Sequence, residues 1–492
     1  MLHGAPWAHA RCLGPILALA LLCSRAAAQE TALVGWTEAQ RASTAVVLQA
    51  FAAAMPGLGW EANFFCDWSG VMCGVTEVQL NVTGVTLADL HVMNTLPEMP
   101  SGVDYTHVVL TQVGISGLGS HLTGSLPRSW SSLTSLMVVL LNGNDLSGTL
   151  PCEWGSLPAL YNLDLSDTNV SGTLPPSWSS MAALSQLLLR NTPLTGGVPE
   201  DWSALTQLSS VSMDNTDVHG TLPVSWQSLR SLRYLWLQNT RVSGTLPAAW
   251  ASITALEQLV LAGTQVTGTL PEMWGAMRAV QFLWLHHTAL SGTLPPSWGA
   301  LTSLTSLYLA DTHVSGTLPA QWQNMVSLST LHLENCNLSG TLPELWGLMP
   351  ALRTIVLTGN TCLGGCVPAM WARRADVQLV LEPRFTASDC AEANTCVTSS
   401  TSTTTTTRQP AAETCTRHSQ RSACEVDGCA ECVCGCPTVC DVCEPGLFLA
   451  PSGVCVGECA DSCAATPAVR RSTLTLASTA LLLALPCVAA LL

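Results

Sequence analysis

Tryptophan recurs at a fixed interval through the middle of this 492-residue chain. Ten tryptophans, from Trp130 to Trp346, follow one another every 24 residues, and Trp371 comes 25 residues after the last of them. So regular an interval indicates a repeat protein, in which each unit forms one coil and packs only against its two neighbours. The period therefore predicts a solenoid before any local secondary structure is considered.

Each unit begins like a leucine-rich repeat, L-x-x-L-x-L-x-x-N-x-L, as in the unit that starts at Leu160. The alternation predicts a strand with Leu163 and Leu165 inward and Asp164 outward, because side chains of a strand point to opposite faces in turn. Gly172 permits a tight turn, and Pro175 sets the convex segment. We expect an α/β solenoid of 24-residue, plant-type coils, with a parallel sheet on its concave face.

Two further columns of the repeat predict core. The tryptophans stand where a leucine would point inward from the convex side, so we expect them to be buried rather than to form a ligand platform. The asparagine position of the motif is mostly threonine, whose hydroxyl can still bond the turn. Cys336 takes that position in one coil and is expected to be a buried thiol; Cys152 lies too many coils away to pair with it. The threonines are Thr168, Thr192, Thr216, Thr240, Thr264, Thr288 and Thr312.

The outward positions of the strands predict what the concave face presents to solvent. Five aromatic residues gather there in neighbouring coils: Tyr234, Trp236, Phe282, Trp284 and Tyr308. Exposed aromatic clusters are enriched at protein interfaces, and solenoids commonly bind partners on this face. We expect a partner-binding site; the alternative is that neighbouring coils or glycans cover the rings.

The two ends of the chain have the composition of targeting signals. Residues 1–28 contain an apolar run and end in three alanines, which predicts a cleaved secretory signal peptide. Residues 463–492 combine a polar spacer with an apolar tail, which predicts removal and attachment of a glycosylphosphatidylinositol (GPI) lipid at Ser462. A site at Ala464, or a retained tail helix, is the alternative.

Caps are expected at both ends of the solenoid, which spans 96–381. In the N-terminal cap, 29–95, Thr37 begins a capping box before a helix, and a short loop carries a Cys66–Cys73 disulfide. The C-terminal cap is expected at 382–397, and four cysteines after the last leucine-rich coil are expected to hold it with two disulfides of undetermined connectivity. These cysteines are Cys362, Cys366, Cys390 and Cys396.

Three segments of biased composition complete the chain. Residues 398–411 are rich in threonine and serine and predict an extended glycosylated stalk. Residues 412–462 hold ten cysteines, which predicts a disulfide-rich module; the spacing of Cys429 and Cys432 also fits zinc, the alternative. N-glycosylation sequons begin at Asn81, Asn169 and Asn337.

Several of these segments match one family in order. They resemble the promastigote surface antigens, or surface antigen 2, of Leishmania-type parasites. The matching segments are the coil ending in Ser-Gly-Thr-Leu-Pro-x-x-Trp, the loop from Cys66 to Cys73, the segment from Leu96 to Tyr105, the threonine stalk and the run from Cys424 to Cys432. The cap and coils also resemble plant extracellular leucine-rich repeats, including receptors and pectinase inhibitors. The chain departs from the family where Cys434 and Cys436 crowd the cysteine spacing.

The resemblance implies a GPI-anchored glycoprotein on the outer face of the plasma membrane, with some members secreted. It implies partners among host cell-surface or complement proteins, in attachment to phagocytes or protection from lysis. Two alternatives stay open: a secreted decoy or inhibitor, and a purely structural coat.

Charge and chemistry narrow the function further. The net charge is −15 and lysine is absent, which excludes a basic nucleic-acid-binding surface. No constellation for catalysis, cofactor, metal or small-molecule substrate is expected, because the histidines are scattered and His286 and His287 have no acidic partner at ligand spacing.

Overall fold

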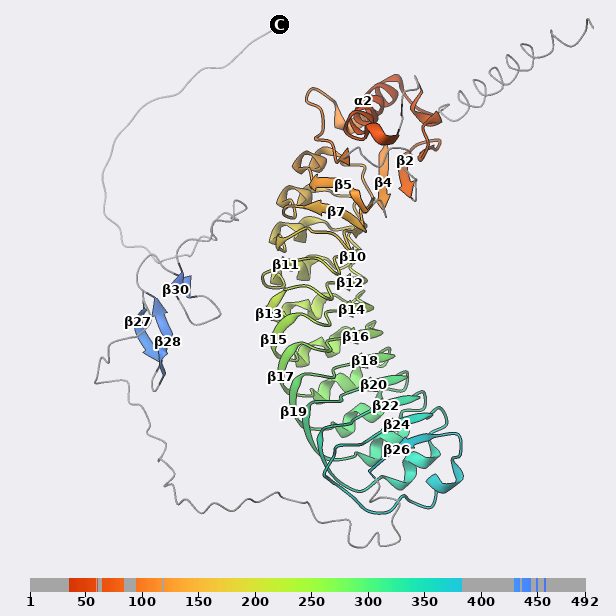
Figure 1. Ribbon diagram of the computed structural model, residues 1–492, viewed down its shortest axis with the longest axis vertical. Helices are drawn as coiled ribbons and strands as arrows, with labels where there is room; N and C mark the ends of the chain where they lie inside the picture. The colour runs from red at the N-terminus through yellow and green to blue at the C-terminus, as the bar shows by residue number, and fades with distance from the viewer. Residues whose placement is uncertain are drawn as a thin grey trace, which may run out of the picture.

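The structure is a computed structural model that describes residues 35–58, 60, 64–83, 94–116 and 119–382, together with short strands at 429–433, 436–443, 448–449 and 455–456. The central part is a curved stack of coils, as the repeat predicts (Figure 1). The signal peptide, Cys390, Cys396, the stalk, Ser462 and the anchor signal lie outside the described residues.

One long sheet lines the concave side of the stack. It has 14 strands, parallel except for the antiparallel pair β1–β2 at its start. Within the repeats each strand pairs with its neighbour without a register shift, so that equivalent residues form straight columns. The strands are β1 (Val71–Cys73), β2 (Val78–Thr83), β4 (Leu110–Ser116), β6 (Val138–Leu140), β8 (Asn162–Asp164), β10 (Gln186–Leu188), β12 (Ser210–Ser212), β14 (Tyr234–Trp236), β16 (Gln258–Val260), β18 (Phe282–Trp284), β20 (Ser306–Tyr308), β22 (Thr330–His332), β24 (Thr354–Val356) and β26 (Gln378–Val380).

A second row of strands, which the repeat pattern did not predict, runs along another side of the coils (Figure 1). Its longest part is a seven-stranded parallel sheet. The first six of these strands each contain the glycine of the repeat, which has a positive φ, as Gly244 does in β15. The seven strands are β13 (His219–Thr221), β15 (Arg241–Thr245), β17 (Gln265–Thr269), β19 (Ala289–Thr293), β21 (His313–Thr317), β23 (Asn337–Gly340) and β25 (Cys362–Leu363); the shorter groups are β3 (Asn94–Thr95), β5 (Gly119–Ser125) and β7 (Asn144–Ser147), and β9 (Gly172–Thr173) with β11 (Leu194–Thr195).

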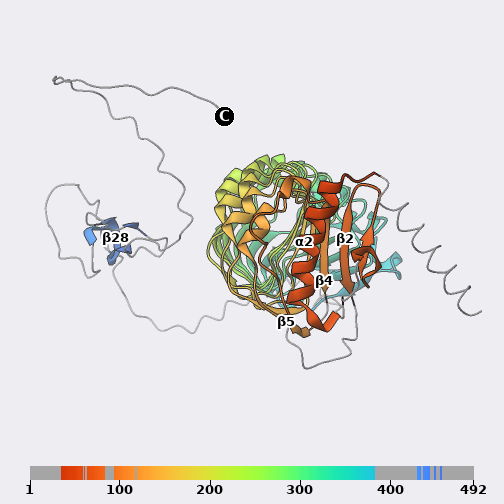
Figure 2. The same cartoon turned by 90° about the horizontal axis from the view of Figure 1, so that it is seen from above.

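The convex segment of each coil is one turn of 3-10 helix that begins after the proline of the repeat. Seen down the stack, these turns lie on one side of the coils and the concave strands on the other (Figure 2). They are η4 (Arg128–Ser132), η5 (Cys152–Ser156), η6 (Pro176–Ser180), η7 (Glu200–Ala204), η8 (Val224–Ser228), η9 (Ala248–Ser252), η10 (Glu272–Ala276), η11 (Pro296–Ala300), η12 (Ala320–Asn324) and η13 (Glu344–Leu348).

The ten regularly spaced tryptophans are core, as predicted: each is at most 1% exposed. Neighbouring rings stack along most of the solenoid, for example Trp202 on Trp226 with centroids 6.5 Å apart. Each indole Nε1 also donates a hydrogen bond to a proline carbonyl of the preceding coil, as Trp226 does to Pro199 at 3.1 Å. The column therefore supplies apolar burial and satisfies a buried carbonyl at the same time.

The threonine column also behaves as predicted. Thr168 is buried and its hydroxyl donates to the Leu165 carbonyl at 2.8 Å, within its own turn. The asparagines at the two ends reach further: Asn144 Nδ2 donates to Leu141 in its own coil and to Ile115 in the preceding one. Cys336 is a buried free thiol, and burial raises its pKa.

The N-terminal cap covers one end of the stack of coils (Figure 2). Helix α2 (Glu38–Ala54) starts with the predicted capping box, in which the Thr37 side chain accepts from the Gln40 amide and the Gln40 side chain accepts from the Thr37 amide. Its buried Phe51 packs on Trp130 with ring centroids 5.6 Å apart. The cap loop holds a disulfide between Cys66 and Cys73.

Candidate functional site

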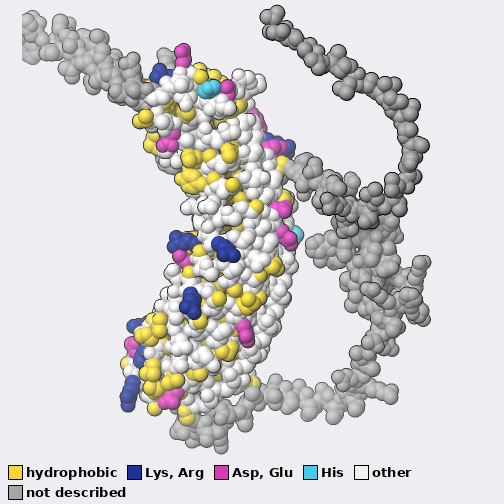
Figure 3. Space-filling view, turned by 180° about the vertical axis from the view of Figure 1, so that it is seen from behind, with side chains coloured by type: hydrophobic (Ala, Val, Ile, Leu, Met, Phe, Trp, Pro, Cys, Tyr) yellow, Lys and Arg dark blue, Asp and Glu magenta, His cyan; other side chains and the backbone are white. Residues whose placement is uncertain are grey.

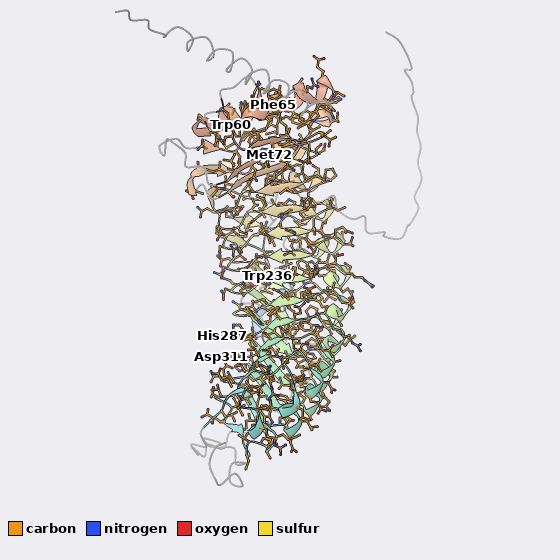
Figure 4. The ribbon with its side chains drawn as sticks, turned by 90° about the vertical axis from the view of Figure 1, so that its right-hand side faces the viewer. Trp60, Phe65, Met72, Trp236, His287 and Asp311 are labelled. Carbon is orange, nitrogen blue, oxygen red and sulfur yellow. A yellow bond between two sulfur atoms is a disulfide. The ribbon has the colours of Figure 1, made fainter. Side chains whose placement is uncertain are left out.

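The concave sheet places the five predicted site residues on three of its strands. Tyr234 and Trp236 lie on β14, Phe282 and Trp284 on β18, and Tyr308 on β20. We call these five residues the aromatic patch. Trp236 stands near the middle of the concave face (Figure 4). Trp284 is 36% exposed and the other four are half-buried, so the rings remain accessible although they pack on one another.

Ring contacts divide the patch into two groups. On β18 and β20, Trp284 makes edge-to-face contacts with Phe282 at 6.3 Å and with Tyr308 at 5.5 Å between centroids. On β14, Tyr234 packs against Trp236 at 5.9 Å. Val260, which is buried, lies on the strand between the two groups.

Polar contacts hold the β14 pair in place. Trp236 Nε1 donates to Gln258 Oε1 at 3.1 Å, and the Tyr234 hydroxyl donates to Glu257 Oε2 at 3.1 Å. Arg233 pairs with the other oxygen of Glu257, and its guanidinium carbon lies 5.4 Å from the Tyr234 ring centroid. These contacts fix the ring orientations, so little side-chain entropy remains to be lost on binding a partner.

A hollow of about 280 Å³ opens between the two aromatic groups. We call it the aromatic hollow; it is lined by Trp236, Gln238, Gln258, Val260, Phe282 and Trp284. Its walls are largely apolar and contain no nucleophile, acid or base. An apolar side chain of a partner is the group that such a site would bury.

Histidines lie beside the aromatic patch, and one of them has an acidic partner that the sequence analysis did not expect. His332 stacks on Tyr308 at 4.4 Å, and its Nδ1 lies 3.0 Å from Glu334 Oε1. His287 does have an acidic partner, since its Nδ1 lies 3.3 Å from Asp311 Oδ2 at one edge of the face (Figure 4). The two members are 24 residues apart, one period of the repeat, so the signal for this pair was present in the sequence and was missed.

The pKa of His286 is lowered, chiefly because the ring is partly buried and secondly because it lies beside His287. Among the residues that the structure describes, no group of three or more histidine, cysteine, aspartate or glutamate side chains could hold a metal ion.

The predicted modification sites differ in exposure. Asn169 and Asn337 are exposed and occupy the same place in the repeat, seven coils apart, beside the second row of strands. Asn81 is half-buried on β2, and its Oδ1 is buried without a hydrogen-bond partner. Of the cap cysteines, Cys362 and Cys366 both form disulfides.

Two polar features of the concave side were missed from sequence. One is a second hollow next to the aromatic hollow. The other is a ladder of residues with left-handed backbone that follow the concave strands from β6 to β24. In it, Asn191, Asn215 and Asn239 each donate to the side chain one coil before, at 2.6–2.8 Å. A signal for the ladder exists, since asparagine, aspartate and glycine recur there every 24 residues and tolerate positive φ.

Comparison with known proteins agrees with this architecture. The Leucine Rich Repeat family model matches residues 159–181 and 327–349. The chain has the fold of a leucine-rich repeat solenoid. A plant peptide hormone receptor, RGFR1 in complex with RGF2, superposes with a TM-score of 0.55 at 26% identity, over 58% of this chain and 45% of the receptor. The Arabidopsis receptor kinase HAESA, in complex with the peptide hormone IDA and the co-receptor SERK1, has the same fold with a TM-score of 0.53 at 23% identity, over 69% of this chain and 61% of that one.

The resemblance to Leishmania-type surface antigens is also confirmed. The chain is 39% identical over 135 residues to the surface membrane glycoprotein GP46/M-2 of Leishmania amazonensis. This similarity spans 27% of this chain and 27% of that relative. The described residues include no helix that is both long and apolar enough to cross a membrane.

Proposed function

We propose that this leucine-rich repeat protein is a non-enzymatic, GPI-anchored surface glycoprotein that docks a host protein on the aromatic patch. The partner would be a host cell-surface or complement protein, and docking would serve attachment or protection from complement. The observation that carries the proposal is the aromatic hollow, an accessible apolar site in which Gln258 holds the Trp236 ring in place. The similarity to a Leishmania surface membrane glycoprotein supports the location.

The placement of two sequons is compatible with this role. Glycans on Asn169 and Asn337 would project beside the second row of strands and leave the aromatic patch open. Surface charge does not single out another docking site on the flank in view in Figure 3, where charged side chains are sparse and scattered. We therefore propose the concave face as the site of the interaction.

A double variant tests the docking site. Trp236→Ala with Trp284→Ala removes both tryptophans of the aromatic hollow and should abolish most adhesion of protein-displaying cells to phagocytes. Tyr161→Ala is the matched control, because Tyr161 is an aromatic residue that is 43% exposed, directly precedes strand β8 of the same sheet and lies outside the patch. Equal adhesion of the folded double variant and the control would reject the site and favour a structural coat.

Phosphatidylinositol-specific phospholipase C tests the anchor. Release of the protein from intact expressing cells would support the GPI anchor at Ser462 or Ala464. Protein found in the medium without enzyme would instead favour the secreted decoy, and retention on treated cells would argue against the proposed anchor.

A further inference from the structure

A second hollow of about 280 Å³ adjoins the aromatic hollow on the concave face. We call it the acidic hollow; it is lined by Asp164, Ser166, Leu188, Arg190, Ser212, Asp214, Trp236 and Gln238. Trp236 and Gln238 line both hollows and form the wall between them. The two hollows therefore follow one another along the solenoid and can be filled by one continuous ligand.

The acidic hollow contains a buried carboxylate without a cation. Asp214 is 6% exposed; it accepts from the Ser212 hydroxyl at 2.5 Å and from Asn215 Nδ2 at 3.3 Å. In the described part of the chain, no basic side chain forms an ion pair with Asp214 or Asp164. A buried carboxylate is costly unless a cation or several hydrogen bonds compensate it, so this hollow favours a positively charged guest.

Arg190 does not supply that cation. Its Nη2 lies 3.4 Å from Asp167 Oδ2 at the rim, where both side chains are exposed. The wall shared with the aromatic hollow adds a further acceptor, because Gln238 Oε1 has no hydrogen-bond partner. The acidic hollow would therefore be complemented by hydrogen-bond donors and positive charge, which agrees with the net charge of −15 for the chain.

The separation of the hollows sets the spacing of a ligand. From Leu188 or Ser212 in the acidic hollow to Val260 in the aromatic hollow there are three or two strand steps. At about 4.8 Å per step this is roughly 10–14 Å, and an extended chain advances about 3.3 Å per residue, so three or four residues span it.

We propose that the paired hollows bind an extended segment of the partner protein, with an arginine or lysine in the acidic hollow and an apolar or aromatic residue three or four positions away in the aromatic hollow. The inference rests on the proposed docking function and names its recognition chemistry. A neutral sugar is disfavoured, because it carries no charge to compensate Asp214 and because Phe282 and Trp284 meet at 89° rather than forming one flat stacking surface.

Labelled synthetic peptides test the pairing by fluorescence anisotropy with the full-length protein. The probes are Arg-x-x-x-Phe and Arg-x-x-Phe peptides, with x a Gly/Ser spacer, together with peptides that carry glutamate in place of arginine. The arginine peptides should bind at least about tenfold more tightly than the glutamate peptides, and increasing salt should reduce that difference. Equal binding of both kinds, or tighter binding of a neutral oligosaccharide, would overturn the inference.

Asp214→Asn tests the acidic hollow separately from the aromatic hollow, because it removes the charge and preserves the shape of the side chain. It should weaken binding of the arginine peptides about tenfold and leave binding of a peptide without charge unchanged. Trp284→Ala, in contrast, should weaken binding of both kinds of peptide. Asp201→Asn is the matched control, since it removes an exposed carboxylate on the convex turn η7. An equal effect of Asp201→Asn would reduce the inference to a general charge effect.

Phagocyte adhesion distinguishes this inference from the broader proposal. If Asp214→Asn adheres normally while the Trp236/Trp284 double variant does not, docking on the patch stands and the cationic anchor is wrong. If neither change affects adhesion, the proposed function itself fails.

Discussion

Trp226 and Trp236 lie in the same stretch of the solenoid but should respond to alanine substitution very differently. Trp226 is 0% exposed, stacks between Trp202 and Trp250, and donates to the Pro199 carbonyl. Trp236 is half-buried on the concave face. Comparing the two substitutions shows whether the buried, regularly spaced tryptophans stabilise the fold more than a tryptophan on the concave face does.

The magnitude follows from burial. A tryptophan side chain buries roughly 200 Å², which at about 25 cal/mol per Å² corresponds to roughly 5 kcal/mol as an upper estimate. Because alanine retains part of this and the coils relax, we expect Trp226→Ala to lower the free energy of unfolding by about 3–5 kcal/mol. Trp226→Phe keeps a stacked ring but leaves the Pro199 carbonyl without its donor, so it should cost less than Trp226→Ala and at least about 1 kcal/mol.

Urea denaturation followed by circular dichroism measures these differences. Trp236→Ala should cost less than about 1.5 kcal/mol, because it removes a partly exposed ring and one hydrogen bond to Gln258. If Trp226→Ala and Trp236→Ala unfold at the same urea concentration, the reasoning from the buried column is wrong.

Three further predictions concern the turn, the histidine cluster and the free thiol. Gly244 has φ +77° and a Cβ there would lie 2.8 Å from Thr221 Cγ2, whereas Gly102 has φ +81° with nothing within 4 Å. Gly244→Ala should therefore destabilise the protein by more than the ~1–2 kcal/mol that the conformation alone costs Gly102→Ala, and equal unfolding midpoints would contradict the contact. Because the folded state lowers the pKa of His286, the unfolded chain takes up this proton at higher pH, so stability should fall as the pH drops through about 6.5. His286→Gln should flatten that part of the urea-unfolding profile, and an unchanged profile would refute the assignment. Cys336 is 4% exposed with a raised pKa, so wild type and Cys336→Ala should react equally with a thiol reagent when native and differ by one thiol when unfolded; a difference in the native proteins would show an accessible thiol.

The repeat alone was enough to predict the stack of coils, the burial of the tryptophan and threonine columns, and the five aromatic residues that share the concave face. A strict period makes this possible, because equivalent residues have equivalent environments and one unit stands for all. The glycines of the second row of strands and the residues of the left-handed ladder also recur as columns, but the second row and the ladder were not predicted. Their hydrogen bonds were not predicted either, since those depend on backbone angles that the pattern does not specify.

The paired hollows depended on the tertiary structure. Asp164 and Asp214 occupy different columns of the repeat and look like ordinary outward polar residues. They share a hollow only because stacking brings their coils together beside Trp236, while Arg190 turns to Asp167 instead. Which carboxylate Arg190 pairs with depends on side-chain size, on rotamer and on distances across three coils. A one-dimensional period describes the positions on which these contacts are built, and the packed solenoid decides which of the contacts form.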